Sequence, residues 1–191
     1  MRTIGYLLIF LMISSASFAH SPILADAITT KTKTDPFRIE KPEHSKAIFA
    51  VLTGQSHYYR IQSDVPFKFY AGITAPKLEN CGLNQTFSFE VLDESFKLIE
   101  HKSGDNFDWT PWYEKWGKKW YWIGPEVGKK FLADRTYQAG TYYIRVFNQT
   151  NNGKYVLAVG DVEEFGIRDV ISLPNKIRKI NSIFWDEGDC Q

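Results

Sequence analysis

The chain has 191 residues, with 23 basic and 22 acidic residues and a formal net charge of +1. Nucleic-acid binding by charge neutralisation needs a basic excess or a concentrated basic stripe, so this balance argues against nucleic acid as a partner. Hydrophobic residues make up 43% of the chain and aromatic residues 16%, which is enough for one domain with an ordinary core.

The first nineteen residues have the pattern of an export signal. Arg2 supplies a positive charge, residues 4–13 form an apolar stretch, and Ser17-Phe18-Ala19 provides a small-x-small cleavage site. The apolar stretch is too short to span a membrane, which needs about 20 residues in a helix. We therefore expect residues 1–19 to be a signal peptide, the mature chain to begin at His20, and the protein to be periplasmic or secreted.

The next segment, residues 20–46, is rich in Thr, Lys, Pro and Ala and has no sustained period. This composition is typical of a leader segment that lies over a domain or stays mobile. From residue 47 on, short runs of β-branched and aromatic residues recur about every ten positions. They predict strands at residues 47–52, 57–62, 66–73, 86–92, 97–101, 130–133, 141–147 and 154–159.

Strand-like alternation is clearest in residues 141–147, where Tyr142, Ile144 and Val146 share one face that we expect to point inward. Asn151-Asn152-Gly153 tolerates positive φ and predicts a hairpin between this strand and the next. About eight strands favour an all-β, two-sheet sandwich over residues 47–160, because packing two apolar faces together buries both.

Three pieces of the sequence resemble the bacterial pre-peptidase C-terminal domain family. They are His57-Tyr58-Tyr59-Arg60-Ile61, then residues 88–93 followed by Lys97-Leu98-Ile99, and residues 139–146 followed by residues 153–159. The resemblance implies a small secreted β-sandwich of jelly-roll type, of a kind commonly appended to hydrolases as an accessory module. Some members bind calcium, but their Asp-x-Asp motif is replaced by Thr86-Phe87-Ser88, so no calcium site is carried over.

The most unusual segment, residues 108–122, contains five of the six tryptophans. Aromatic rings presented by a loop can stack on sugars or hold peptides and lipid headgroups. Lys115, Lys118 and Lys119 add hydrogen-bond donors beside the rings. The alternative is that several rings pack structurally against the sandwich. The predicted ligand-binding residues are Trp109, Trp112, Tyr113, Trp116, Trp120 and Trp122.

Apolar residues recur at helical spacing after residue 160, and Pro174 interrupts the series. Residues 161–191 therefore predict a helical extension of two short helices, the second capped by Ser172. The basic residues Arg168, Lys176, Arg178 and Lys179 lie opposite the apolar stripe. Packing on the chain's own domain is the favoured interpretation. The alternative is contact of residues 161–185 with a membrane surface or an envelope protein.

Cysteine and histidine usage allows two further expectations. Cys81 and Cys190 are the only cysteines, and an oxidising compartment favours a disulfide between them. A mature N-terminal His20 offers its α-amine and imidazole to copper, and a copper protein is an alternative to a binding module.

Motifs for hydrolysis, Gly-x-Ser-x-Gly and His-Glu-x-x-His, do not occur in the sequence. We predict no catalytic residues, no metal site and no cofactor, with calcium and copper left open. The leading hypothesis is an exported non-catalytic module that recognises a glycan, peptide or envelope component through the aromatic loop.

Overall fold

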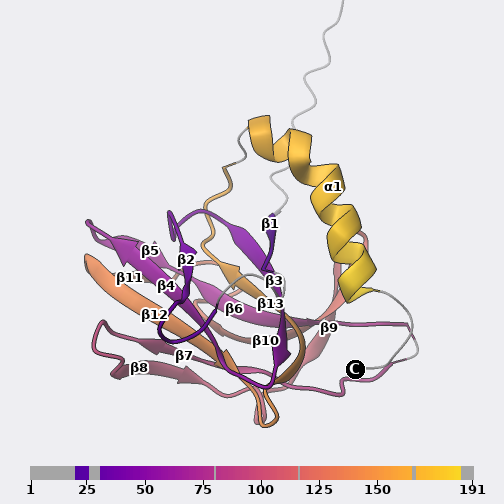
Figure 1. Ribbon diagram of the computed structural model, residues 1–191, viewed down its shortest axis with the longest axis horizontal. Coiled ribbons are helices and arrows are strands. Elements are labelled where there is room, and N and C mark those ends of the chain that lie inside the picture. The colour runs from indigo at the N-terminus through magenta and orange to yellow at the C-terminus, as the bar shows by residue number, and fades with distance from the viewer. Residues whose placement is uncertain (1–19, 26–30, 80, 116, 165–166, 186–191) are drawn as a thin grey trace, which may run out of the picture.

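The computed structural model describes residues 20–25, 31–79, 81–115, 117–164 and 167–185, with side chains from residue 173 on in the last range. These residues form a mostly β structure in which two large sheets pack together, as predicted (Figure 1). The six-stranded sheet has the order β1 (Ser21–Leu24), β3 (Lys46–Thr53), β13 (Asn152–Val159), β6 (Ala71–Pro76), β10 (Lys119–Val127) and β9 (Thr110–Glu114). The five-stranded sheet has the order β2 (Phe37–Ile39), β4 (His57–Ser63), β12 (Gly140–Phe147), β7 (Ser88–Leu92) and β8 (Leu98–Lys102).

The main core lies between the inner faces of the two sheets. In β12, Ile144 and Val146 are fully buried and Tyr142 packs against the core, so the predicted inward face is confirmed. The same alternation of side chains in β3 and β4 places one face of each strand in the core. Burial of both inner faces stabilises the sandwich because it removes apolar surface from water.

Residues 20–46 contribute to both sheets rather than forming a separate leader segment. β1 pairs in parallel with β3, and β2 pairs in parallel with β4. These strands have only four and three residues, which is too short for alternation to be recognised in the sequence. Their place at the sheet edges is decided by pairing with strands that lie elsewhere in the chain.

Two predicted strands differ in the structure. Residues 66–73 divide into β5 (Phe67–Phe69) and β6, which belong to different sheets. β5 pairs instead with β11 (Arg135–Tyr137). Residues 130–133 form a tight turn, not a strand, because Lys130 and Phe131 have positive φ. The carboxylate of Glu126 accepts hydrogen bonds from both of their backbone N–H groups, which holds this turn.

The predicted hairpin between β12 and β13 is also absent, since these strands lie in opposite sheets (Figure 1). The intervening turn does contain positive φ at Asn151 and Gly153, as the sequence indicated. This turn carries the chain from one sheet to the other. The turn residues therefore predicted that the chain changes direction here, but not which strands β12 and β13 would pair with.

In its described residues, the C-terminal extension forms one helix, α1 (Ile167–Phe184), rather than two. Pro174 lies inside it, and Figure 1 shows the helix bending in its N-terminal part, as expected where a proline removes a backbone donor. Ile180 and Phe184 pack on Phe49 and Val156 of the outer face of the six-stranded sheet. Among the described residues, no helix is both long and apolar enough to cross a bilayer.

Candidate functional site

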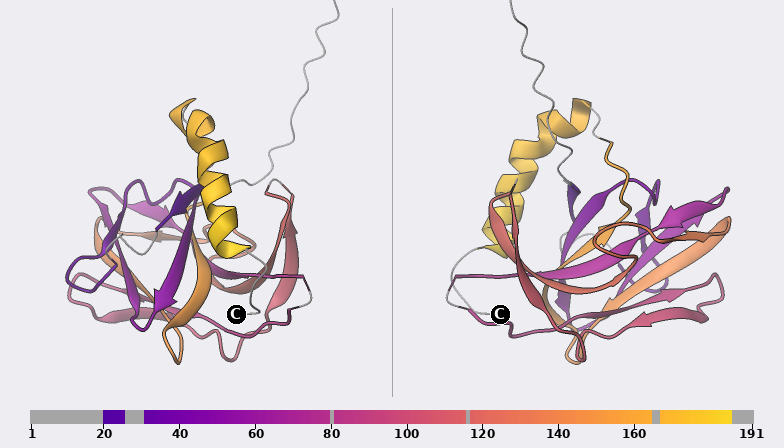
Figure 2. Two further views of the ribbon diagram at one scale, coloured as in Figure 1. Left: turned by 45° about the vertical axis from the view of Figure 1, so that its right-hand side comes forward. Right: turned by 180° about the vertical axis from the view of Figure 1, so that it is seen from behind.

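The tryptophan-rich segment is a β-hairpin at the edge of the six-stranded sheet, not a loop. β9 pairs antiparallel with β10, and β10 pairs on its other side with β6. Figure 2 shows the hairpin extending beyond the body of the sandwich beside the C-terminal end of α1. Aromatic residues favour strands, so pairing with β6 decides between strand and loop at this position.

Trp109 belongs to the core, so it is not available to a ligand. Its Nε1 donates a hydrogen bond to the carbonyl oxygen of Gly104 at 2.9 Å, which satisfies the buried indole. The ring lies against Gly124, where an added Cβ would come within 2.4 Å of Trp109 Cη2. The absence of a side chain at Gly124 therefore makes room for this tryptophan.

One face of the hairpin is turned toward α1. Tyr121 and Trp112 are cross-strand partners on this face, and the Tyr121 ring lies 5.3 Å from that of Trp185 just after the helix. Trp112 also lies 5.3 Å from Phe131, although 36% of Trp112 is exposed. These contacts give Trp112 a packing role on the helix side of the hairpin.

Side chains alternate along a strand, so Tyr113 and Trp120 point to the face turned away from α1. They are cross-strand partners with ring centroids 5.2 Å apart, and 40% of Tyr113 and 46% of Trp120 are exposed. Lys77 lies beside these two residues, since its backbone N donates a hydrogen bond to the carbonyl oxygen of Trp120 at 2.9 Å. Its Nζ lies 5.4 Å from the centre of the Trp122 ring. We call Lys77, Tyr113, Trp120 and Trp122 the aromatic platform.

Trp122 is the inner end of the platform. It packs partly against the core, and its Nε1 is buried with no hydrogen-bond partner among the described residues. A cavity of about 20 Å³ lies beside it, lined also by Leu83, Asn84 and Gln85. A cavity of this size holds roughly one water molecule or one small polar group.

The predicted ligand-binding residues are therefore divided among several environments. Tyr113 and Trp120 share an exposed face, Trp122 adjoins them, Trp112 lies on the opposite face, and Trp109 is in the core. Trp116 lies outside the described residues. Lys77 was not predicted, because it is 36 or more residues away from Tyr113, Trp120 and Trp122 in the sequence and only strand pairing brings it beside them.

His20 and the cysteines have separate settings. The His20 Nδ1 hydrogen-bonds with the hydroxyl of Ser45, and burial lowers the pKa of His20 to about 4. In the part of the chain that the structure describes, no group of three or more His, Cys, Asp or Glu residues is placed to hold a metal. Copper at His20 stays a prediction. Cys81 is disulfide-bonded; Cys190 lies outside the described residues, so their pairing also stays a prediction.

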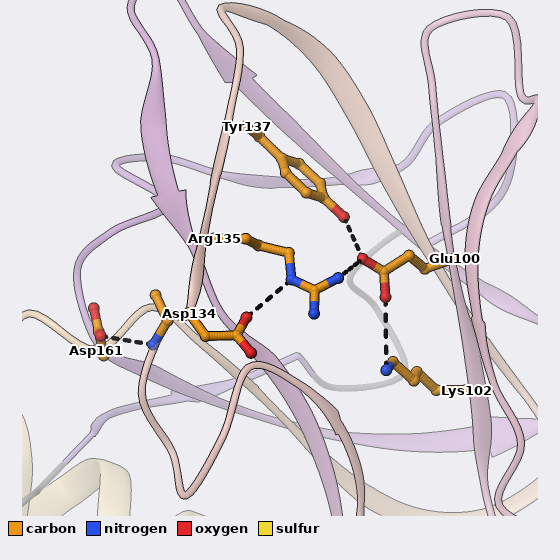
Figure 3. Close-up of polar contacts among 7 residues, drawn as sticks. Glu100, Lys102, Asp134, Arg135, Tyr137 and Asp161 are labelled. Atoms are coloured by element: carbon orange, nitrogen blue, oxygen red, sulfur yellow. Dashed lines mark hydrogen bonds and ion pairs between the residues drawn. The ribbon is translucent and has the colours of Figure 1, made fainter.

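A cluster of charged side chains joins β8 to β11 (Figure 3). Glu100 pairs with Arg135, accepts a hydrogen bond from Tyr137 Oη at 3.2 Å, and lies 3.6 Å from Lys102 Nζ. Arg135 also donates to Asp134 at 2.9 Å, and this bond lowers the pKa of the Asp134 carboxyl. The carboxylates of Glu100 and Asp134 both contact cationic side chains. The cluster therefore connects the five-stranded sheet to the two-stranded sheet of β5 and β11, and it does not offer an acid–base pair.

A buried polar chain links the two sheets from inside. His57 Nδ1 lies 2.7 Å from Tyr155 Oη, which in turn lies 2.6 Å from Tyr59 Oη. Burial, reinforced by the positive charge of Lys31, lowers the pKa of His57 to about 4. The imidazole is therefore neutral near pH 7. An open cavity of about 180 Å³ lies beside His57. Most of its other lining residues carry a hydroxyl or an amide: Thr32, Thr53, Gln55 and Ser56.

Comparison with known proteins finds no matching family model and no matching curated protein. Among solved structures, the chain is similar to the pre-peptidase C-terminal domain of collagenase from Bacillus anthracis, with 14% identity and a TM-score of 0.34 over 65% of this chain and 91% of that one. It is also similar to the catalytic domain of a GH87 alpha-1,3-glucanase in complex with nigerose, with 14% identity and a TM-score of 0.31 over 61% of this chain and 22% of that one. The predicted resemblance is confirmed, but the TM-scores are low, so no ligand or activity is carried over.

Proposed function

We propose that the protein is an exported, non-catalytic binding module that recognises a glycan, peptide or envelope component through the aromatic platform. One observation carries this proposal: Tyr113 and Trp120 lie side by side on one face of the hairpin with 40% and 46% of their surfaces exposed. Large aromatic rings contribute strongly to binding because they bury much apolar area at a low cost in side-chain entropy.

The platform is favoured over structural packing because other rings already perform that packing. Trp109 fills the core, and Tyr121 with Trp112 occupies the face toward α1. Tyr113 and Trp120 contact each other without being enclosed by either sheet. Adjacent exposed rings carry a risk of aggregation unless they are used, which favours a binding role.

The proposal also includes a jelly-roll topology for the sandwich and export of the protein from the cytoplasm. We infer a jelly roll, because eight central strands form two layers in the interleaved orders β3-β13-β6-β10 and β4-β12-β7-β8. Export to the periplasm or the outside of the cell rests on the signal pattern in residues 1–19, which lie outside the described residues.

The proposal is tested by titrating the processed protein with cell-wall fragments, polysaccharides and peptides while tryptophan fluorescence is recorded. The double variant Tyr113→Ala/Trp120→Ala should weaken binding of the ligand at least about tenfold, since it removes both exposed rings. Phe107→Ala is the matched control, because Phe107 is also 40% exposed but lies outside the platform. Binding that survives in the double variant, or a flat response to every fragment, would contradict the proposal.

A further inference from the structure

Positive charge surrounds the aromatic platform although the whole chain is nearly neutral. The Nζ of Lys77 lies over the ring of Trp122, and no carboxylate within the described residues forms an ion pair with it. Lys115 and Lys118 are exposed at the end of the hairpin, and neither has an ion-pair partner in the same described part of the chain. The ligand that complements this surface is therefore negatively charged.

A nearby acid offsets only part of this charge. Glu114 is the last residue of β9, and its carboxylate accepts a hydrogen bond from the backbone N of Gly117. Its one negative charge leaves the charges of Lys77, Lys115 and Lys118 in excess. The residues that line the small cavity beside Trp122 include no carboxylate. An anionic group over the platform would thus meet the amine of Lys77.

The position of the rings favours a glycan over a lipid surface. Tyr113 and Trp120 lie on one face of paired strands with their ring planes 49° apart, so each ring can stack against the apolar face of a sugar ring. The opposite face is packed through Trp112 and Tyr121, so the hairpin does not present exposed rings evenly on both sides. Beside the platform, the small cavity adjoins Trp122, whose buried Nε1 has no hydrogen-bond partner among the described residues, so a hydroxyl or a carboxylate oxygen can accept from it there.

We infer that the platform binds an acidic glycan, with sugar rings stacked on Tyr113 and Trp120 and a carboxylate or phosphate group near Lys77. This inference rests on the proposed function and narrows its ligand class. It does not require a metal ion, because the amine supplies the charge. Screening of this charge by salt weakens the interaction.

The first experiment is calorimetric titration of the processed protein at low and high salt. The probes are an oligouronate, its carboxyl-reduced neutral counterpart of equal length, and a phosphate-bearing oligosaccharide. We expect an acidic oligosaccharide to bind at least about tenfold more tightly than the neutral one, and high salt to reduce this difference. Lys77→Gln should weaken acidic-glycan binding severalfold, whereas Lys68→Gln, an exposed lysine on β5, should leave it unchanged.

The second experiment follows the indole N–H signals by NMR during the same titration. Signals of Trp120 and Trp122 should shift when the acidic glycan binds. The signal of Trp109 should not, because its N–H is bonded to Gly104 inside the core. This internal control separates binding at the platform from a general change in the fold.

The outcomes distinguish this inference from the proposed function. Equal affinity for acidic and neutral glycans, or an unchanged affinity in Lys77→Gln, would overturn the acidic-glycan inference. The platform proposal would still stand if Tyr113→Ala/Trp120→Ala lost binding. If the protein bound vesicles of anionic phospholipid but no glycan, the acidic-glycan inference would also be overturned, and the ligand of the platform would be a membrane surface. Ligand binding that persists in the double variant would overturn both.

Discussion

His57 shows how a single buried side chain is adapted to the interior of the sandwich. It sits on the inner face of β4 and hydrogen-bonds to Tyr155 of β13, which bonds to Tyr59. These contacts satisfy polar atoms that would otherwise be costly to bury. They also join strands of opposite sheets at a point where the remaining core is apolar. The lowered pKa of His57 is the consequence of this placement.

Acidification should therefore destabilise the protein through His57. Its pKa is about 4 in the folded state against the ordinary histidine value of 6.5, so the unfolded chain binds the proton more tightly between these values. The free energy of unfolding should fall as pH is lowered through this window, by up to about 3 kcal/mol from His57. Urea unfolding at several pH values measures this fall, which should be smaller in His57→Gln. His20 and the carboxylates should account for the part of the fall that remains in the variant. If the free energy of unfolding fell equally in the variant and in the unmodified protein, His57 would not be the cause.

The helix α1 covers the outer face of the six-stranded sheet. Phe184 is fully buried, and its ring meets Phe49 of β3 edge to face at 5.2 Å. Ile180 and Val156 extend this second apolar cluster. The apolar side of the helix is therefore used within the chain, and the exposed residues Arg178 and Lys179 lie on its other side.

Removing the helix contact should be costly. Phe184→Ala leaves a cavity between α1 and the sheet, and such changes cost about 3–5 kcal/mol. Chemical denaturation should show this loss as a lower midpoint. Arg178→Ala is the matched control on the exposed side of the helix and should change stability by less than about 0.5 kcal/mol. A Phe184→Ala variant as stable as the control would mean that the helix does not contribute to the fold.

In the molecule as a whole, the two ends of the described chain contact the sandwich. β1 lies at one edge of the six-stranded sheet and α1 covers its outer face, so both ends of the described chain contact the same layer. The disulfide of Cys81 adds a covalent link in the segment between β6 and β7. Because the sequence contains two cysteines, Cys190 is the partner that we predict.

Reduction of this disulfide should lower the stability of the whole domain. Closing a loop of about 100 residues contributes up to about 4.7 kcal/mol in the chain-entropy model. Non-reducing digestion and mass spectrometry should recover one peptide that joins Cys81 to Cys190. The melting temperature should fall with a reductant, and the double variant Cys81→Ser/Cys190→Ser should melt at the lower temperature without responding to it. Alkylation of both thiols without prior reduction would contradict the prediction.

Much of the sandwich could be predicted because strand alternation is a local property. The spacing of Tyr142, Ile144 and Val146 indicates one buried face whatever strand lies next to it. The same reasoning located β3, β4 and β13 to within a few residues. The sequence therefore determined the all-β class, the principal strands and the presence of helix near the C-terminus.

The pairing of distant segments was decided only by the tertiary structure. β12 and β13 are neighbours in sequence but lie in opposite sheets, and Trp109 and Trp120 belong to the same aromatic segment but have opposite burial. Strand partners that are far apart in the chain, such as β6 and β10, determine which rings face the core and bring Lys77 beside them. No local period records these pairings, because their free energy comes from contacts between segments rather than within one.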